Sequence, residues 1–321
     1  MAPGQAVVIS LPNSAELVID LLALLDLNAI PVLVPEGLGI PALRAARQAT
    51  AAAWIRDARG VRRGAPPRGR LDESITLVKV SSGSTGQPKA VALTPRNLRF
   101  DGRQVRRGLR ARPADRVLIS LPLLHSYGFD FGFLQLLFGT ALILAAPLPR
   151  AITAALAAGA TIFPAIPFVL DLLSRHAKAL RPVALRAVVS AAAPLAPELA
   201  ARAARALGRP IRPHYGSTEG GALTLGRRQR WPGDVGFPLL GVGLRLRGKR
   251  VEACGAQVAL GYLSKGHLAR RFGGRFLSQD RGRIGKDGSL TLLGRADRVR
   301  VLPSGTKEAV LTRGNTQPAG R

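Results

Sequence analysis

Short apolar runs alternate with amphipathic stretches along the first part of the chain. Ala6–Ser10 and Ile30–Val34 have the composition of buried strands. Between them, Ala15–Leu27 shows helical periodicity, and Asn13 or Ser14 is available to cap that helix. Near-continuous Val, Ile and Leu runs are typical of parallel strands that helices cover on both faces. The pattern therefore predicts an α/β fold.

The same pattern continues as far as residue 232 and then changes. Further strands are expected at Ile75–Val80, Val117–Leu121, Ala141–Ala145, Thr161–Phe163, Ala187–Ser190 and Ile211–Tyr215. Arg56–Arg70 is rich in Gly, Pro and Arg, which predicts an exposed loop. Beyond Gly233, short strands alternate with glycine turns. We therefore expect an α/β core at 1–232, a smaller β-rich subdomain at 233–297 and a short tail at 298–321.

One apolar stretch is long enough to raise the question of a membrane span. Ala151–Leu170 carries no charge, but Gly159, Pro164 and Pro167 interrupt it. A helix, a turn and a buried strand fit this stretch better than a transmembrane helix. Met1–Pro12 lacks the basic start and cleavage site of a signal peptide. We expect a cytoplasmic protein without a membrane span.

Composition adds a strong basic charge and few other constraints. The chain has 321 residues, is 47% hydrophobic and carries a formal net charge of +28. A single cysteine, Cys254, excludes a disulfide framework within the chain. Such charge is typical of proteins that meet nucleic acid, anionic membranes or acidic proteins. Nucleic acid is the least favoured of these, because no recognised motif accompanies the charge and aromatic residues make up only 5%.

The clearest chemical signal is a Ser/Gly/Thr cluster that follows a predicted buried strand. It runs Ser81-Ser82-Gly83-Ser84-Thr85-Gly86-Gln87-Pro88-Lys89. Glycines let the backbone approach a phosphate, hydroxyl and amide groups donate to its oxygens, and a lysine adds a positive charge. The spacing between the glycines and the lysine differs from that in the P-loop of nucleoside triphosphatases. A flexible linker is the alternative, but a linker would not directly follow a buried strand.

This cluster, followed by Ala90-Val91, resembles the signature of the adenylate-forming superfamily, which includes acyl-CoA synthetases, acyl-AMP ligases and luciferases. A second match follows about 130 residues later, at His214-Tyr215-Gly216-Ser217-Thr218-Glu219-Gly220. The resemblance implies that Tyr215 stacks on adenine beside Gly216, that Thr218 contacts the α-phosphate, and that Glu219 and Thr85 help to hold Mg²⁺. It also implies the multi-layered, doubly wound α/β fold of that family's large N-terminal domain, with the β-rich subdomain towards its end.

Three weaker matches lie in the family's order. Ser190-Ala191-Ala192-Ala193-Pro194-Leu195 resembles Ser-Gly-Gly-Ala-Pro-Leu, with alanines in place of the glycines that line the adenine and acyl site. Pro122-Leu123-Leu124-His125 lies where the family has its acyl pocket, which implies His125, Phe129 and Ala191 as substrate-pocket residues. A lone histidine among apolar residues is otherwise most often a core residue. Gln279-Asp280 and Gly294-Arg295-Ala296-Asp297 resemble the ribose-binding and hinge motifs, which implies roles for Asp280 and Arg295 at the nucleotide.

The resemblance also defines where the chain departs from the family. Only 24 residues follow Asp297, whereas family members usually continue into a further domain that carries a late catalytic lysine. Gln279 replaces the glycine of the ribose motif. We therefore expect the large N-terminal domain without its C-terminal domain, which a separate chain could supply.

Two functions remain open on this basis. The first is ATP- and Mg²⁺-dependent activation of a carboxylic acid, a fatty or aryl acid, to acyl-AMP, with transfer to coenzyme A or to a carrier-protein thiol. Lys89, Thr218 and Glu219 would be its catalytic residues, and Ser81, Ser82, Gly83, Ser84, Thr85, Gly86 and Ala192 would contact the nucleotide. The second is a non-catalytic relative that binds nucleotide or acyl carrier protein.

Part of the charge has a definite place. Arg99, Arg103, Arg106, Arg107 and Arg110 recur at helical spacing beside a narrow stripe of Leu98, Val105 and Leu109. A solvated arginine face in an arginine-rich protein is one interpretation. The other is a docking site for an acidic acyl carrier protein or for the phosphates of coenzyme A.

Overall fold

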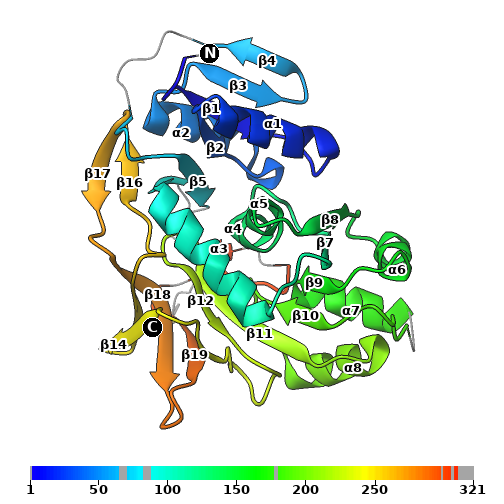
Figure 1. The fold of residues 1–321 in the computed structure, drawn as a ribbon. Helices are drawn as coiled ribbons and strands as arrows, with labels where there is room; N and C mark the ends of the chain where they lie inside the picture. Colours follow the sequence, from blue (N-terminus) through cyan, green and yellow to red (C-terminus); the bar gives the residue numbers. More distant parts are fainter. Residues whose placement is uncertain are drawn as a thin grey trace, which may run out of the picture.

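A computed structural model describes residues 2–64, 71–81, 88–176, 180–297, 299–304 and 307–309. Two large sheets and the helices around them form most of the molecule (Figure 1). The helical segments are α1 (Ala15–Asp26), η1 (Glu36–Leu38), α2 (Gly39–Thr50), α3 (Pro95–Leu109), α4 (Ser126–Gly128), the π-helical turn η2 (Phe129–Phe133), α5 (Leu134–Leu137), α6 (Pro149–Ala157), α7 (Pro167–His176) and α8 (Pro197–Leu207). The predicted cap of the first helix is confirmed, because Ser14 Oγ accepts a hydrogen bond from the Leu17 amide at 3.0 Å.

The first sheet has eight strands. In spatial order they are β17 (His267–Arg271), β16 (Gly261–Ser264), β6 (Lys89–Leu93), β5 (Leu77–Ser81), β2 (Ile30–Leu33), β1 (Ala6–Ser10), β3 (Trp54–Asp57) and β4 (Gly60–Arg63). Strands β5, β2 and β1 are parallel, as expected, and β3, which was not predicted, is parallel to β1. The prediction of a loop at Arg56–Arg70 is wrong for the first half of that range. There, β3 and β4 form a hairpin at this edge of the sheet. In this hairpin the glycine follows the tight turn, and the arginines lie on the exposed edge strand.

The second sheet has seven strands. In spatial order they are β13 (Phe237–Pro238), β12 (Gly221–Leu225), β11 (Ile211–Ser217), β10 (Ala187–Ser190), β9 (Ile162–Ala165), β7 (Arg116–Ile119) and β8 (Ala141–Leu144). Strands β8, β7, β9, β10 and β11 are parallel, and β12 and β13 are antiparallel additions. The uncharged stretch 151–170 comprises most of α6, then β9 and the start of α7, as predicted. None of the described helices combines the length and apolarity that a membrane crossing requires.

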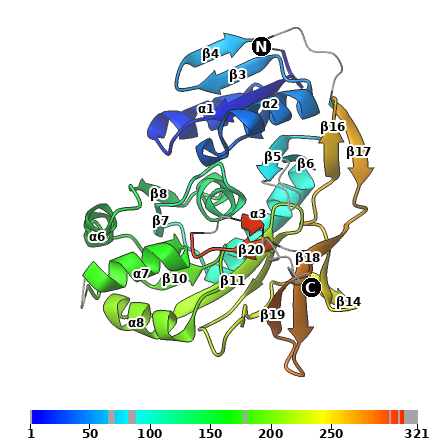
Figure 2. The same cartoon turned by 180° about the vertical axis from the view of Figure 1, so that it is seen from behind.

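The strands after Gly233 belong to several sheets. A separate antiparallel sheet contains β14 (Gly243–Arg247), β15 (Arg250–Cys254), β18 (Arg275–Ile284) and β19 (Leu290–Arg295). In contrast, β13 and the β16–β17 hairpin extend the two large sheets. The hairpin of β20 (Val299–Val301) and β21 (Lys307–Ala309) lies near α7, where Pro303 accepts a hydrogen bond from the Phe168 amide at 3.3 Å (Figure 2). A domain division at Gly233 stays a prediction.

Alternate residues of the central strands are buried in different cores. On β1, Val7 and Ile9 face the core between the two sheets, whereas Val8 faces an outer core under α2. On β7, Ile119 faces the shared core and Leu118 faces an outer core under α6, α7 and α8. Helices α1 and α3 contribute to the shared core. The fold is therefore a five-layer α/β/α/β/α arrangement, and the predicted multi-layered α/β class is confirmed.

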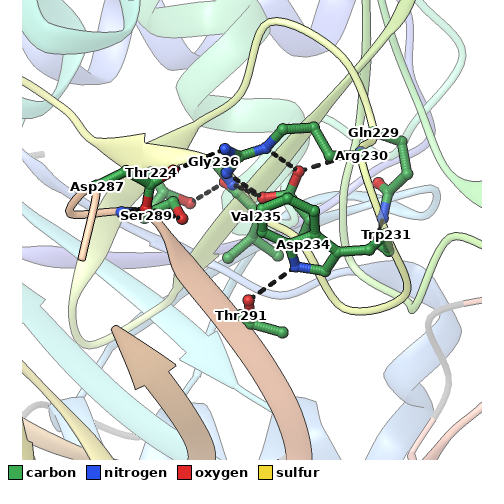
Figure 3. A network of polar contacts seen from close by, with 10 residues as sticks. All are labelled: Thr224, Gln229, Arg230, Trp231, Asp234, Val235, Gly236, Asp287, Ser289 and Thr291. Atoms are coloured by element: carbon green, nitrogen blue, oxygen red, sulfur yellow. Dashed lines mark hydrogen bonds and ion pairs between the residues drawn. The ribbon is translucent and has the colours of Figure 1, made fainter. Parts of the chain in front are cut away.

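A buried ion pair fixes the loop between β12 and β13. Asp234, with no exposed side-chain surface, accepts hydrogen bonds from Arg230 Nε at 2.8 Å and from the Gly236 amide at 3.0 Å (Figure 3). Arg230 also reaches the exposed Asp287 at 2.9 Å. Trp231 Nε1 donates to Thr291 Oγ1 at 2.9 Å, on β19. The loop thus joins the seven-stranded sheet to the four-stranded one.

The two carboxylates that share Arg230 should differ sharply in their effect on stability. We expect Asp234→Asn to lower the free energy of unfolding by about 3 kcal/mol, because it removes the charge of a fully buried carboxylate and leaves Arg230 only the exposed Asp287 as a partner. Asp287→Asn is the matched control and should change little, because its charge is solvated. Urea unfolding of the two variants measures the difference. Equal losses would contradict this assignment.

Candidate active site

Ser81 and Lys89 stand opposite each other at the two ends of the predicted phosphate loop. They end β5 and begin β6, and they are cross-strand partners in the antiparallel pair. Ser81 Oγ is buried and has no hydrogen-bond partner among the described residues. The loop residues Ser82, Gly83, Ser84, Thr85 and Gly86 lie outside the described residues. The structure thus describes the base of the predicted phosphate loop and the lysine that follows it.

The turn between β11 and β12 brings Glu219 towards Lys89. Tyr262, on β16, donates a hydrogen bond to Glu219 Oε1 at 2.9 Å. Lys89 Nζ lies 5.1 Å from the centroid of the same tyrosine ring. Burial raises the pKa of Tyr262, and the nearby Glu219 charge raises it further, so the hydroxyl stays protonated and remains a donor. One aromatic side chain therefore links two residues that the sequence assigned to separate motifs.

Thr218 lies beside the start of α4. Its hydroxyl accepts a hydrogen bond from Ser126 Oγ at 2.9 Å. Ser217 Oγ accepts from the Gly220 amide at 2.9 Å, which closes the turn around Thr218 and Glu219. The second predicted motif and the predicted acyl-pocket segment are therefore neighbours in the structure.

A β-bulge precedes this turn. Tyr215 pairs with Thr224 and Gly216 pairs with Ala222, so the register shifts there and the extra residue, Leu223, lies on β12. At Gly216 a Cβ would lie 2.7 Å from the Gly221 carbonyl oxygen, so only glycine fits there. Bulges commonly redirect a side chain next to a functional site. Here the bulge separates Tyr215, which points into the protein, from the turn that carries Thr218 and Glu219.

Tyr215, Asp280 and Arg295 form one polar chain. The Tyr215 hydroxyl donates to Asp280 Oδ2 at 2.8 Å, and Arg295 Nη1 lies 3.1 Å from Asp280 Oδ1. Arg295 also makes a two-pronged ion pair with Asp297, at 2.7 and 2.6 Å. Burial raises the pKa of Tyr215 well above its usual value, and the Asp280 charge adds to the effect. The structure therefore brings the predicted adenine, ribose and hinge residues together.

The alanines after β10 lie at a strained position. Ala192 has φ +70°, in the left-handed region that favours glycine. Ala191 is buried and Ala192 is exposed. Buried hydroxyls without a hydrogen-bond partner among the described residues occur here at Ser190 and, after β7, at Ser120. Together with Ser81, these groups mark the carboxyl ends of parallel strands, where open α/β sheets bind their ligands.

The two predicted pocket residues that flank α4 have different surroundings. His125 is exposed and immediately precedes α4, so it is not a core histidine. Phe129 is 1% exposed and packs on Phe133, with Lys79 Nζ 4.8 Å from its ring centroid. Lys79 makes a buried ion pair with Asp130 at 2.6 Å. Asp130 is therefore occupied by an internal partner.

The residues present suit a nucleotide-bound metal ion better than a protein-bound one. Among the described residues, no three His, Cys, Asp or Glu side chains gather as metal ligands. Mg²⁺ usually takes one or two carboxylates and completes its shell with phosphate oxygens and water. Glu219 can supply such a carboxylate, because only its Oε1 is engaged by Tyr262 within the described part of the chain.

Two residues, Tyr262 and Asp101, escaped the sequence analysis. Tyr262 lies 43 residues from Glu219 and outside every motif, so only strand pairing reveals it. Asp101, on α3, accepts a hydrogen bond from the Ala222 amide at 2.8 Å, and burial together with the Asp130 charge raises its pKa to about 8. Its place on the apolar side of a helix that is otherwise rich in arginine is the one signal that could have found it.

Comparison with known proteins shows the family to which the chain belongs. Residues 56–263 match the family described as AMP-binding enzyme, and the chain belongs to that family. It is 30% identical over 249 residues to a probable CoA ligase, CCL9, of Humulus lupulus, which covers 69% of this chain and 47% of that protein. It is also 30% identical over 227 residues to the 2-succinylbenzoate–CoA ligase of Salmonella typhimurium, covering 70% and 48%. The chain thus spans about half the length of the curated relatives it matches.

The fold has close counterparts among solved structures. The O-succinylbenzoate coenzyme A synthetase MenE of Bacillus subtilis, in complex with AMP, superposes with a TM-score of 0.80 at 19% sequence identity. The superposition covers 94% of this chain and 70% of that one. The recognition of the adenylate-forming fold from sequence is confirmed.

The strain at Ala192 leads to a stability prediction. We expect Ala192→Gly to raise the free energy of unfolding by about 1 kcal/mol, because glycine adopts this backbone conformation without a steric penalty. Ala193 does not have a positive φ, so Ala193→Gly is the control and should lower stability by about 0.5–1 kcal/mol. Thermal and urea unfolding check both. A loss of stability in Ala192→Gly would show that the strain is absent.

His214 gives the protein a pH-dependent stability. Its ring stacks with Tyr127 at a centroid distance of 5.7 Å, and its Nδ1–H donates to the Thr224 carbonyl at 2.6 Å. Burial lowers the pKa of His214 from 6.5 to about 4, although the Thr224 hydrogen bond opposes the shift. Between these values the unfolded chain binds a proton that the folded chain excludes, so this contribution is present above pH 6.5 and lost as the pH falls.

The loss should reach about 3 kcal/mol by pH 4. In His214→Gln the proton-binding group is gone, so the stability gap to the wild type should narrow as the pH falls from 6.5 to 4. Unfolding by urea at several pH values measures that gap, and His267→Gln, at an exposed position, is the control. A gap independent of pH would refute the assignment.

Proposed function

We propose that this chain carries the nucleotide- and acid-binding site of an AMP-forming acid–thiol ligase, which activates a carboxylic acid to acyl-AMP at the expense of ATP. The observation that carries the proposal is the convergence of Lys89, Tyr262 and Glu219 at the base of the phosphate loop. A cation and a carboxylate held by one aromatic side chain suit a bound polyphosphate and its metal ion.

The residues divide the binding of ATP between them. Lys89 and the hydroxyls and amides of residues 81–86 hold the phosphates, and Thr218 donates to the α-phosphate. Tyr262 fixes the orientation of the Glu219 carboxylate. Asp280, held by Tyr215 and Arg295, accepts hydrogen bonds from the ribose hydroxyls, beside Ala192 and Gly216 at the adenine. Mg²⁺, when bound, neutralises charge on the phosphate oxygens.

The reaction needs no covalent enzyme nucleophile. An oxygen of the substrate carboxylate forms a bond to the α-phosphorus, and the bond from that phosphorus to pyrophosphate breaks with its electron pair. Catalysis of such a step consists mainly of positioning and charge neutralisation. Lys89 stabilises the negative charge that accumulates on the departing pyrophosphate, and Glu219 would supply a carboxylate ligand to the metal ion.

The acid is proposed to be an unsubstituted acyl or aryl acid, bound near His125, Phe129 and Ala191. Asp130, which follows Phe129 in the sequence, is buried and paired with Lys79, so it does not serve as an anchor for a substrate amine. The curated relatives named as CoA ligases support coenzyme A as the acceptor thiol of the whole protein, with a carrier-protein thiol as the alternative.

Exchange of labelled pyrophosphate into ATP tests the first step. With a panel of short, medium-chain and aryl acids, we expect acid-dependent exchange by the wild-type chain in the presence of Mg²⁺. Glu219→Gln should lower the exchange rate by about 100-fold, because the charge that holds the metal ion is lost. Tyr262→Phe should lower it by roughly tenfold, because Glu219 loses its orienting hydrogen bond.

Glu198→Gln, at an exposed position on α8, is the matched control and should leave exchange unchanged. ATP binding, followed by calorimetry, separates the alternatives. Absence of exchange with every acid despite measurable ATP binding would refute the catalytic proposal and favour a non-catalytic nucleotide-binding protein. A higher Mg²⁺ requirement in Glu219→Gln would identify the carboxylate as a metal ligand.

A further inference from the structure

The exposed face of α3 carries a row of arginines that the site does not use. A groove with a cavity volume of about 430 Å³ is lined by Arg96, Arg99, Phe100, Arg103, Gln104 and Arg107. The row differs from the one expected from sequence. Arg106 turns away and donates to Thr140 Oγ1 at 3.0 Å, and Arg110 follows the last helical residue.

The positive charge of this row has no acidic partner in the part of the chain that the structure describes. Within the described ranges, no ion pair or hydrogen bond engages the guanidinium groups of Arg96, Arg99, Arg103 and Arg107. Elsewhere on the chain, Arg56, Arg186, Arg230 and Arg295 all pair with carboxylates. The acidic residue on the same helix, Asp101, lies on its buried side, where burial raises its pKa to about 8. Because four neighbouring positive charges repel each other, this surface favours an anionic binding partner.

The spacing of the row indicates an extended occupant. Steps of three, four and four residues place the arginines on one side of the helix over about 16 Å, at a rise of 1.5 Å per residue. One phosphate group reaches only part of this length. A second helix with carboxylates at the same intervals would face all four guanidinium groups at once.

Apolar groups beside the row point to a protein. The half-buried Phe100 lines the groove, and a Cβ on Gly241 would lie 3.1 Å from its ring. The segment 239–241 therefore runs against α3, and its middle residue, Leu240, is 67% exposed. Arginine and phenylalanine are enriched in protein interfaces, and an exposed leucine beside them suits a desolvated contact rather than a nucleic-acid backbone.

We propose that this face of α3, with Leu240 at its side, is the docking surface for a helix of an acidic partner protein, whose carboxylates recur every three to four residues. This proposal goes beyond the function assigned to the active site and does not depend on it. Asn97 holds the helix in place from below, because its amide donates to the carbonyls of Ala256 and Val258 at 2.8 and 2.9 Å. The surface is therefore preformed, which lowers the entropic cost of docking.

Fluorescence anisotropy with two synthetic helical peptides tests the surface. One peptide carries four glutamates at steps of three, four and four residues, with one leucine beside them. The other has the same composition with the glutamates spread around the helix. We expect the patterned peptide to bind the wild-type chain about tenfold more tightly, because only it faces all four arginines. Arg99→Glu/Arg103→Glu should weaken its binding by at least about tenfold.

Arg44→Glu/Arg59→Glu is the control, because it makes the same change in net charge at exposed positions on α2 and in the β3–β4 turn. The patterned peptide should bind this variant as it binds the wild type. Equal binding of the two peptides, no binding of either, or equal losses in the two variants would overturn the proposal. The proposal would also be overturned if duplex DNA displaced the peptide and if the binding of DNA depended on the same arginines. Circular dichroism verifies folding, and loss of pyrophosphate exchange alone would count only against the proposed catalytic function.

Discussion

The structure depends on one apolar layer that the two large sheets share. Strands β1, β5, β7 and β10 are buried on both faces, so their side chains have no access to water along most of their length. Polar groups of these strands therefore concentrate at the carboxyl ends, where Ser81 and Ser190 follow long apolar runs. The proposed active site is at this edge because the apolar interior disfavours unpaired donors and acceptors.

The exception within the shared layer is the group of Lys79, Asp130 and Asp101. Charges in an apolar layer are tolerated only when they pair or become neutral. Lys79 and Asp130 pair directly, and Asp101 holds its proton to an unusually high pH while it accepts from the Ala222 amide. These contacts connect β5, η2, α3 and β12, so the polar group fixes how α3 and the π-helical turn sit between the sheets.

Much of the fold could be predicted from the sequence because its strands are continuous apolar runs. Lys89, at the start of β6, and Glu219, in the β11–β12 turn, could be found because they lie within short local motifs. Tyr262 could not, since its role depends on the pairing of β16 with β6, which joins segments 170 residues apart. The β3–β4 hairpin was missed for a related reason, because an exposed edge strand with arginines has the composition of a loop.

The bulge at Tyr215 and Gly216 makes the length of the β11–β12 hairpin as important as its composition. Successive residues of a strand point to opposite faces, so one residue more or fewer exchanges every side chain beyond that point. Removal of Leu223, the extra residue on β12, would exchange the faces of the residues on one side of the deletion, although each residue of the motif would still be present. Point substitutions and changes of length therefore affect this site in different ways. A substitution removes one functional group, whereas an insertion or deletion of one residue changes the face on which the neighbouring side chains lie.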